Sequence, residues 1–590
     1  MGALSKEMQN FHNSQTQLIT SCKNYFLKDG NQLKEFDSSV ASPEILPAPI
    51  RAIFDDIEPE YHAQIDRAVK LGISAYQKNN GGDMPHPSII ASALQAGVGV
   101  VQEYKSDKAV FDSVADLVKS SPLFDDASNV AYEQAAIVPA LTVVTIASLI
   151  ANSLPIVAML PNPTGSMRVP IVAVRHVTDS TFGAMKAGEY IDGENAGLPY
   201  AEGRFRFAMP NTSGAAYSVI AHVAYDDYVA KTPDTNTKLL PFLSGNVSIR
   251  VNGIEVAHTR GDQDLSVSTG TISAMPKKGI VIDGTEYKVI SSTIDIDNSK
   301  IDVEFNAALP SDAKVQVCLV ADFNAKDAND TKAHKIHPVG LSYTAEYDTI
   351  QSVPMHNMIT ISYDSQNQLA QELGLGFTGV ALAQMQGKVY LEQNVRLLGE
   401  LYDRAIYNGR ESVFDASRGV TGNLSSAYNT TADLVAEVVK HIELSKQNIR
   451  QASGGATVGY DLYVGDTAAI LFKLMPPEKF KSTGAVATYT EIVRIGTLSD
   501  GTHVYQMPKT QGVLPEDVGV SSIMLVGRGN EPARNPLTGT ITLAPTIREA
   551  RKDTREAHYG LHSQMAAEVN PIKRYGDQSS VIHMINLPAL

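Results

Sequence analysis

Two patterns of hydrophobic positions divide this chain of 590 residues. Apolar residues recur at helical spacing over residues 88–104 and 106–121. From residue 217 to 322, apolar and polar positions instead alternate with period two, and Asn252-Gly253 is a two-residue hairpin signal within this region. We therefore predict an all-β domain, residues 210–339, inserted into a mixed α+β chain.

The segment ahead of this domain contains a long polar, Gly-rich stretch. Residues 1–104 are predicted to form an N-terminal arm and helical region that begins with a short helix. Residues 169–177 form an apolar strand, and residues 179–209 follow as a loop that a compact core does not require. Ordered loops of this length are mostly functional. Two interpretations are open here: a flexible surface loop, or an arm that contacts a neighbouring subunit.

The C-terminal part alternates helices and strands. A long helix is predicted over residues 366–407, where Leu391, Val395, Leu398 and Tyr402 share one face. The other predicted elements are two extended segments within 340–363, a loop at 410–429, a helix from Thr430, a strand at 460–464, a helix at 466–474, strands at 504–507 and 522–526, and a final strand at 580–587; residues 558–568 show no clear period.

Composition and charge limit the classes of function. The net charge is −15, with 43% hydrophobic residues, so this is a globular chain that does not bind nucleic acid by neutralising phosphates. Its two cysteines, Cys22 and Cys318, lie far apart and indicate no disulfide framework. Residues 135–160 carry no charge, but Pro139 and Pro155 interrupt them. We predict a buried helix followed by a buried strand there, and no membrane span.

Motifs for catalysis and ligand binding are weak. Gly374, Gly376 and Gly379 match a dinucleotide fingerprint, but the residues before them are helical in character, whereas the motif follows a strand. His558 and His562 have the spacing of metal ligands on a helix, without a third ligand. We predict no catalytic, cofactor-binding or metal-binding residues. Further weak candidates are His334 and His337, the aspartates Asp295, Asp297 and Asp302, and the tripeptide Arg260-Gly261-Asp262.

Three short segments carry a family resemblance. Residues 163–175 read PTGSMRVPIVAVR, residues 363–373 read YDSQNQLAQEL, and residues 460–474 are a strand that leads into a helix. In this order they resemble the turn after the N-terminal arm, the start of the spine helix, and the axial domain of the major capsid proteins of tailed bacteriophages, in particular large myoviruses. The resemblance covers roughly residues 105–209 and 340–590.

The resemblance implies the HK97-like capsid fold, an α+β fold, with the inserted all-β domain as an addition. Lys186 in the loop is a candidate for covalent cross-linking by location only, and Glu58 and Glu60 beside Pro59 are a poor context for N-terminal processing. The implied segments are 1–104, N-terminal arm and helical region; 105–209, N-arm strand and extended loop; 210–339, inserted β domain; 340–409, peripheral domain with spine helix; 410–545, axial domain; and 546–590, return to the peripheral domain.

The function implied by the resemblance is structural and not enzymatic: self-assembly into an icosahedral head shell that encloses double-stranded DNA. The implied partners are other copies in hexamers and pentamers, scaffold, portal and decoration or minor capsid proteins, and packaged DNA without sequence-specific binding; no membrane is involved. The implied location is the virion, after assembly in the host cytoplasm. The alternatives are a tail-sheath or baseplate subunit, a cellular nanocompartment shell, a carbohydrate-binding protein and a cytoplasmic enzyme.

Overall fold

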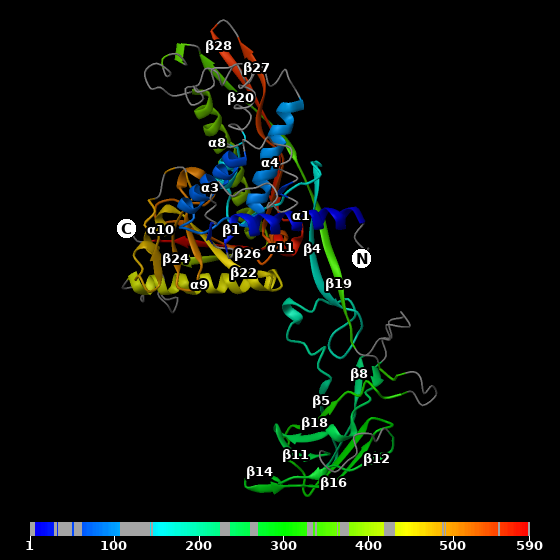
Figure 1. The fold of residues 1–590 in the computed structure, drawn as a ribbon. Helices are drawn as coiled ribbons and strands as arrows, with labels where there is room; N and C mark the ends of the chain where they lie inside the picture. The colour runs from blue at the N-terminus through cyan, green and yellow to red at the C-terminus, as the bar shows by residue number, and fades with distance from the viewer. Residues whose placement is uncertain are drawn as a thin grey trace. The chain divides into compact units, whose positions relative to one another are not determined.

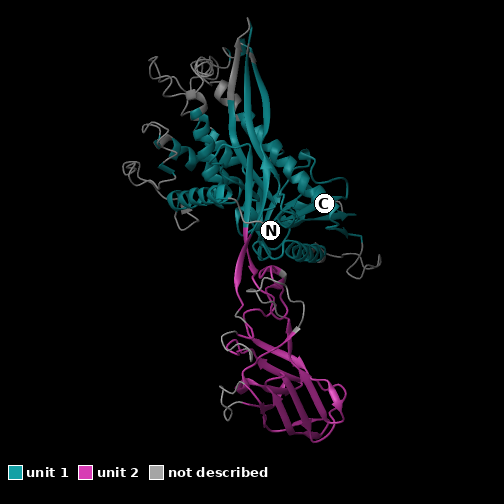
Figure 2. Cartoon of the chain, turned by 90° about the vertical axis from the view of Figure 1, so that its right-hand side faces the viewer, with its two compact units in different colours: residues 1–173, 345–590 teal, residues 174–344 magenta. Residues whose placement is uncertain are grey.

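The computed structural model divides the chain into two compact units (Figure 2). Unit 1 consists of residues 1–173 and 345–590, and unit 2 of residues 174–344. The chain enters unit 2 within β4 (Arg168–Thr178) and leaves it within β19 (Leu341–Gln351), and these strands pair with each other. The structure describes residues 6–28, 32–33, 50–51, 62–106, 142, 145–224, 237–259, 269–326, 334–336, 339–362, 364–365, 368, 377–417, 431–486, 489, 491–552 and 555–587.

Unit 2 is built around two five-stranded antiparallel sheets (Figure 1). Their strand orders are β13-β11-β10-β18-β5 and β12-β16-β17-β7-β6. The predicted hairpin is confirmed, because Asn252 and Gly253 join β10 to β11 with φ angles of 48° and 82°, as in a type I′ turn. The strands are β5 (Arg204–Ala208), β6 (Asn211–Ser213), β7 (Ala216–Ile220), β10 (Ser248–Val251), β11 (Ile254–His258), β12 (Thr271–Ile272), β13 (Met275–Pro276), β16 (Val289–Asp295), β17 (Lys300–Phe305) and β18 (Val315–Val320).

Unit 2 begins earlier in the chain than the predicted insert. Strand β5 precedes residue 210 and pairs with β18 at the edge of a five-stranded sheet. Phe182, Met185 and Tyr200 are buried in the same apolar cluster as the sheet residues. The expectation that a core does not require residues 179–209 is therefore wrong for these side chains. Their burial depends on isolated apolar residues between glycines, a pattern that has no periodicity to detect.

The Gly-rich loop is also fastened to β4 by polar contacts. The guanidinium of Arg175 lies 3.5 Å above the ring of Tyr190 and forms an ion pair with Asp192. The hydroxyl of Tyr200 donates a hydrogen bond of 2.8 Å to the carbonyl oxygen of Gly340. These contacts hold the loop against the two strands that connect the units.

Unit 1 contains a four-stranded sheet and a seven-stranded sheet. Their orders are β20-β28-β27-β3 and β21-β29-β26-β22-β25-β24-β23. The strands of the first sheet are β3 (Val157–Met159), β20 (Val353–Ser362), β27 (Leu537–Lys552) and β28 (Glu556–Val569). Those of the second are β21 (Glu411–Asp415), β22 (Thr457–Val464), β23 (Phe480–Ser482), β24 (Val493–Leu498), β25 (His503–Gln506), β26 (Ser521–Gly529) and β29 (Ser579–Ile585). The prediction of a mixed α+β chain is confirmed.

Two C-terminal segments differ from the prediction. Residues 411–415, predicted as loop, form β21, which pairs in parallel with β29. Residues 558–568, which show no clear period, lie within β28. Strand β28 is hydrogen-bonded to β20 on one side and to β27 on the other. A strand that is paired on both sides can form without a strict alternation of apolar and polar residues. The final strand predicted at 580–587 is present as β29, which lies in the seven-stranded sheet.

The predicted spine helix is present as α8 (Phe377–Tyr407), but its buried face is displaced. Of the four predicted residues only Leu398 is fully buried, whereas Tyr390, Leu397, Leu401 and Ala405 form the buried stripe. The buried face is thus rotated by about one residue, or about 100°, from the predicted face. The sequence did not show this, because α8 has apolar residues on both faces and only packing selects which face is buried. Helices α9 (Thr431–Ala452) and α10 (Asp466–Lys473) confirm the other two predictions in this region.

The N-terminal helices of unit 1 are α1 (Lys6–Phe26), α3 (His62–Asn79) and α4 (Pro87–Ser106). Helix α1 is longer than the short helix predicted, and its buried residues recur at helical spacing. Residues 145–152 are helical and lead to the buried strand β3, as predicted. The helix predicted at 106–121 falls almost wholly outside the described residues. Among the helices that are described, none is long and apolar enough to cross a membrane.

Candidate functional site

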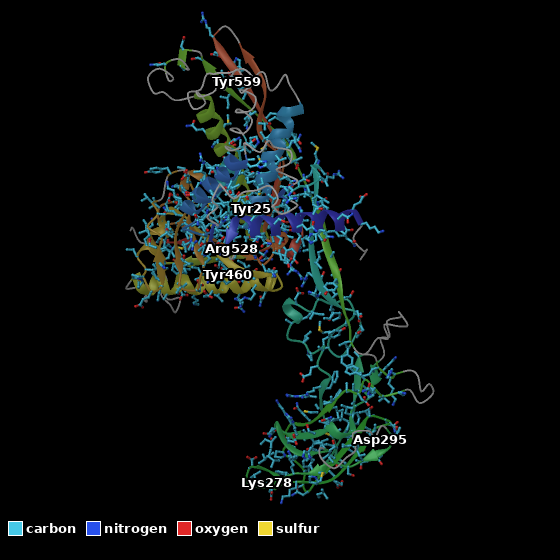
Figure 3. All side chains as sticks on the ribbon, in the orientation of Figure 1. Tyr25, Lys278, Asp295, Tyr460, Arg528 and Tyr559 are labelled. Carbon is cyan, nitrogen blue, oxygen red and sulfur yellow. The ribbon has the colours of Figure 1, made fainter. Side chains whose placement is uncertain are left out.

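Charged side chains gather where the turn after α3 meets the seven-stranded sheet. Asp461 on β22 is fully buried, and its Oδ1 lies 3.3 Å from Nε of Arg528 on β26 and 3.5 Å from Nδ1 of His503 on β25. Strand β22 lies between β25 and β26, and the parallel register pairs Asp461 directly with His503. Arg528 is labelled in Figure 3. Together with Asp83 and Arg494, these residues are called the charge cluster.

Arg494 on β24 fastens the turn after α3 to the sheet. Its Nη1 donates a hydrogen bond of 2.9 Å to the carbonyl oxygen of Asn80 and forms an ion pair with Asp83. Gly81 in this turn has a φ of +62°, and a Cβ added there would lie 2.8 Å from Cγ2 of Thr483. The turn therefore requires glycine both for its backbone conformation and for its close approach to the sheet.

Burial shifts two pKa values of the cluster in opposite directions. It raises the pKa of the Asp461 carboxyl to about 6, although Arg528 and Arg494 favour the charged form. Burial and the same two guanidinium groups lower the pKa of His503 to about 4. At neutral pH Asp461 is therefore a carboxylate and His503 a neutral imidazole. The ion pairs of the cluster join the turn after α3 to the seven-stranded sheet.

The second notable feature of unit 1 is the edge of the four-stranded sheet. Among the described strands, β20 pairs with β28 alone, in continuous register from Val353 to Ser362. This strand of ten residues contains no Asp, Glu, Lys or Arg, and its pairing shows no register shift. Val353 and Met358 are 54% and 65% exposed. Pro354 removes one N–H from this edge, but a long, regular and uncharged strand still offers its other backbone groups for pairing with another chain.

The face of α8 that the sequence predicted as buried lines a groove. Leu391 and Val395 border a space of about 380 Å³, together with Lys388, Glu392, Arg396, Thr510 and Gln511. Lys388 is engaged in an exposed ion pair, 3.2 Å long, with Glu392. The charged groups of the groove are paired at the surface, Lys388 with Glu392 and Arg396 with Glu400, so the groove does not define a reaction site.

The structure places His558 and His562 on strand β28 instead of a helix. Nδ1 of His558 lies 3.0 Å from Oγ1 of Thr360, and Nδ1 of His562 lies 3.1 Å from Nδ1 of His356 on β20. The two histidines therefore contact different partners. Over the described residues, no group of three or more His, Cys, Asp or Glu side chains is placed to hold a metal ion.

The remaining sequence candidates are not brought together. Asp295 accepts hydrogen bonds from Asn298 and Asp297 at the end of a strand, and those from Asn298 lower its pKa. This contact stabilises a turn. Asp302 forms an ion pair with Lys300, and Gly379 lies in α8. Lys186 is exposed, Cys22 is buried and Cys318 is half-buried. The other candidates, residues 58–60, 260–262, 337, 374 and 376, lie outside the described residues.

Sequence reasoning missed both the charge cluster and the open edge. The members of the cluster come from four strands and a turn that are up to about 450 residues apart, so no motif links them. A signal for the edge was present, because residues 353–362 contain no charge. That signal does not distinguish an edge strand from a central one, since buried strands are uncharged as well.

Comparisons with known proteins give structural similarity only. No protein-family model and no curated protein matches the chain. Among solved structures, the chain is similar to the capsid of jumbo bacteriophage PhiKZ (8% identity, TM-score 0.33, 72% of this chain and 90% of that chain). It is also similar to the capsid of Myoviridae phage XM1 (10%, 0.26, 44% and 81%) and to a virus-like particle from Pyrococcus furiosus (9%, 0.23, 42% and 80%). Because these TM-scores are low, the function proposed below rests on the chain's own residues and topology.

Proposed function

We propose that this chain is the major capsid protein of a tailed bacteriophage, a structural and non-enzymatic subunit with the HK97-like fold. The observation that carries the proposal is the open edge of β20, which is long, regular and uncharged. Strand addition to such an edge joins chains through main-chain hydrogen bonds. The order of elements supports the proposal: strand, β-rich unit, two extended segments, long helix and α/β sheet follow one another as the resemblance implies.

The two sheets of unit 1 correspond in this proposal to the two domains of a capsid subunit. The four-stranded sheet with α8 is the peripheral domain, and the seven-stranded sheet with α9 and α10 is the axial domain around five- and six-fold axes. Unit 2 is the insertion. The partners are copies of this chain in hexamers and pentamers, with scaffold, portal and decoration or minor capsid proteins as further ones.

The proposed location is the virion, after assembly in the host cytoplasm. The net charge of −15 suits a wall around packaged double-stranded DNA, because an acidic protein does not adhere to phosphates. Binding to that DNA is accordingly without sequence specificity. Many modest contacts suffice to close such a shell, since each subunit contacts several neighbours.

Electron microscopy of the purified full-length chain, alone and with phage assembly factors, tests the proposal. Closed shells with clusters of five and six subunits are the expected result. Tubes with a helical lattice different from a capsid surface would instead indicate a sheath protein. Monomers that persist at high concentration under both conditions would contradict an assembly function, and the β-rich unit would then be screened for ligands.

A further inference from the structure

Two histidines face each other across β20 and β28 in unit 1. His356 and His562 are direct partners in the antiparallel register. Their rings stack with centroids 4.5 Å apart and planes inclined by 28°, and the two Nδ1 atoms are 3.1 Å apart. His562 is 8% exposed, whereas His356 is exposed to solvent. The pair therefore consists of one buried ring, that of His562, and one solvent-exposed ring, that of His356.

We propose that His356 and His562 form a two-histidine site for a divalent transition-metal ion of the Zn²⁺, Ni²⁺ or Cu²⁺ class. Two imidazole nitrogens bound to one tetrahedral ion, each at 2.0–2.1 Å, are about 3.3 Å apart. The observed separation of 3.1 Å lies close to this value without any ion bound. Imidazole ligands select these metals over Mg²⁺ and Ca²⁺.

The surroundings of His562 favour the tautomer that a metal ligand needs. The side-chain amide of Gln564 lies 3.5 Å from Nε2 of His562. Oxygen and nitrogen of such an amide are interchangeable by rotation, so its oxygen can accept the Nε2 proton of His562. Nδ1 then presents its lone pair toward His356. Metal-binding histidines commonly donate their second ring N–H to a group of this kind.

The same geometry explains why a cation would stabilise the pair. Two Nδ1 lone pairs at this distance repel each other unless one ring carries its proton there or an ion lies between them. Because His356 is exposed, water is available to accept a proton from its second ring nitrogen. With two protein ligands and no third among the described residues, water fills the remaining positions, so the site is exchangeable.

Binding at this site would join the edge strand β20 to its neighbour β28. The metal would then reduce the opening of residues 353–362, because an ion that binds only the paired state stabilises that state. This effect goes beyond the proposed assembly function, since it is measured on the unassembled chain.

The experiment is calorimetric titration of the full-length chain with Zn²⁺ and Ni²⁺, followed by Cu²⁺ electron paramagnetic resonance. Wild type is expected to bind one ion more than His356→Ala and His562→Ala, with a Cu²⁺ signal from two nitrogens. Gln564→Leu is expected to bind about tenfold more weakly. The matched control is His558→Ala, on the same strand and outside the pair, which should bind as wild type.

Hydrogen exchange provides a second readout. Zn²⁺ is expected to slow amide exchange in residues 353–362 of wild type and not in His356→Ala. Because His356 is exposed, its substitution keeps the test valid if His562→Ala does not fold. Equal stoichiometry in wild type and His356→Ala, or an equal loss in His558→Ala, would overturn the proposal and leave a hydrogen-bonded histidine pair.

Discussion

The two units differ at one edge of their main sheets. In the two five-stranded sheets of unit 2 the edge strands are β13, β12 and β6, which have two or three residues each, and β5, whose exposed positions include Arg204 and Arg206. In unit 1 the edges β3, β21 and β23 are also short, but the edge strand β20 has ten residues and no charged side chain. Short strands and charges prevent pairing with other chains. The edges of the five-stranded sheets of unit 2 thus oppose pairing with another chain, whereas β20 of unit 1 is suited to such pairing.

The units also differ in where they place charge. Ion pairs on the five-stranded sheets of unit 2, such as Lys300 with Asp302, lie at the surface, and the buried Arg175 pairs with the half-exposed Asp192 of the Gly-rich loop. Unit 1 buries the charge cluster around Asp461 between a turn and its sheet. Exposed pairs contribute little to stability, whereas removing one partner of a buried pair is costly. Similar substitutions should therefore have unequal effects in the two units.

The largest effect is expected from charges introduced on the β20 edge. The double variant Val353→Lys/Met358→Lys should remain folded and lose assembly, because lysine on an edge strand opposes pairing. A penalty of about 1.4 kcal/mol per contact already weakens each association about tenfold. The matched control is Val281→Lys/Ile290→Lys in unit 2, at positions that are 64% and 63% exposed. Sedimentation velocity measures the assembly of both variants. If the two variants assemble equally well, the β20 edge has no special function in assembly.

The next largest effect is expected in the charge cluster. Asp461→Ala should lower the free energy of unfolding by about 3 kcal/mol, because Arg528 would be left without its buried partner. Asp302→Ala in unit 2 should change it by less than about 0.5 kcal/mol. Urea unfolding followed by circular dichroism compares the two. Similar losses would show that burial does not separate these ion pairs.

A third prediction concerns the Gly-rich loop of unit 2. Tyr200→Ala should destabilise the unit by about 2 to 3 kcal/mol, because it removes a buried ring and the hydrogen bond to Gly340. Leu198→Ala, at a position that is 40% exposed, should have an effect within about 0.5 kcal/mol. Thermal unfolding measures both. If Tyr200→Ala is neutral for stability yet blocks assembly, the loop acts as an arm after all.

The smallest effect is the pH dependence of the charge cluster. The folded pKa of Asp461, about 6, lies above its ordinary value of 3.8, so this group stabilises the fold at low pH and loses that contribution as pH rises through 6. The folded pKa of His503, about 4, lies below its ordinary 6.5, so its contribution is lost as pH falls through 4. The two contributions oppose each other in one pH window, and wild type should show little net dependence from this pair.

Single substitutions separate the two contributions. As pH falls from 7 to 4.5, His503→Gln should gain about 1 to 3 kcal/mol of stability relative to wild type. Over the same fall in pH, Asp461→Asn should lose stability relative to wild type. Urea unfolding at both pH values, with wild type as reference, measures each difference. The same sign of change in both variants would contradict the opposite pKa shifts.

The sequence by itself determined the local elements with strong periodicity or turn chemistry. Alternation and Asn252-Gly253 specified the hairpin of unit 2, and the helix predicted from Thr430 is present as α9. These features depend on neighbours in the chain, so the local pattern contains them. The mixed α+β class followed from the same patterns.

Only the tertiary structure decided which surfaces meet. It selected Leu397 and Leu401 instead of Leu391 and Val395 as the buried face of α8, and it placed Tyr200 in a core. It also assembled Asp461, His503 and Asp83 into one cluster and left β20 at an edge. Burial, pairing at a strand edge and pKa shifts depend on contacts between residues far apart in the chain, and a local pattern carries no information about those contacts.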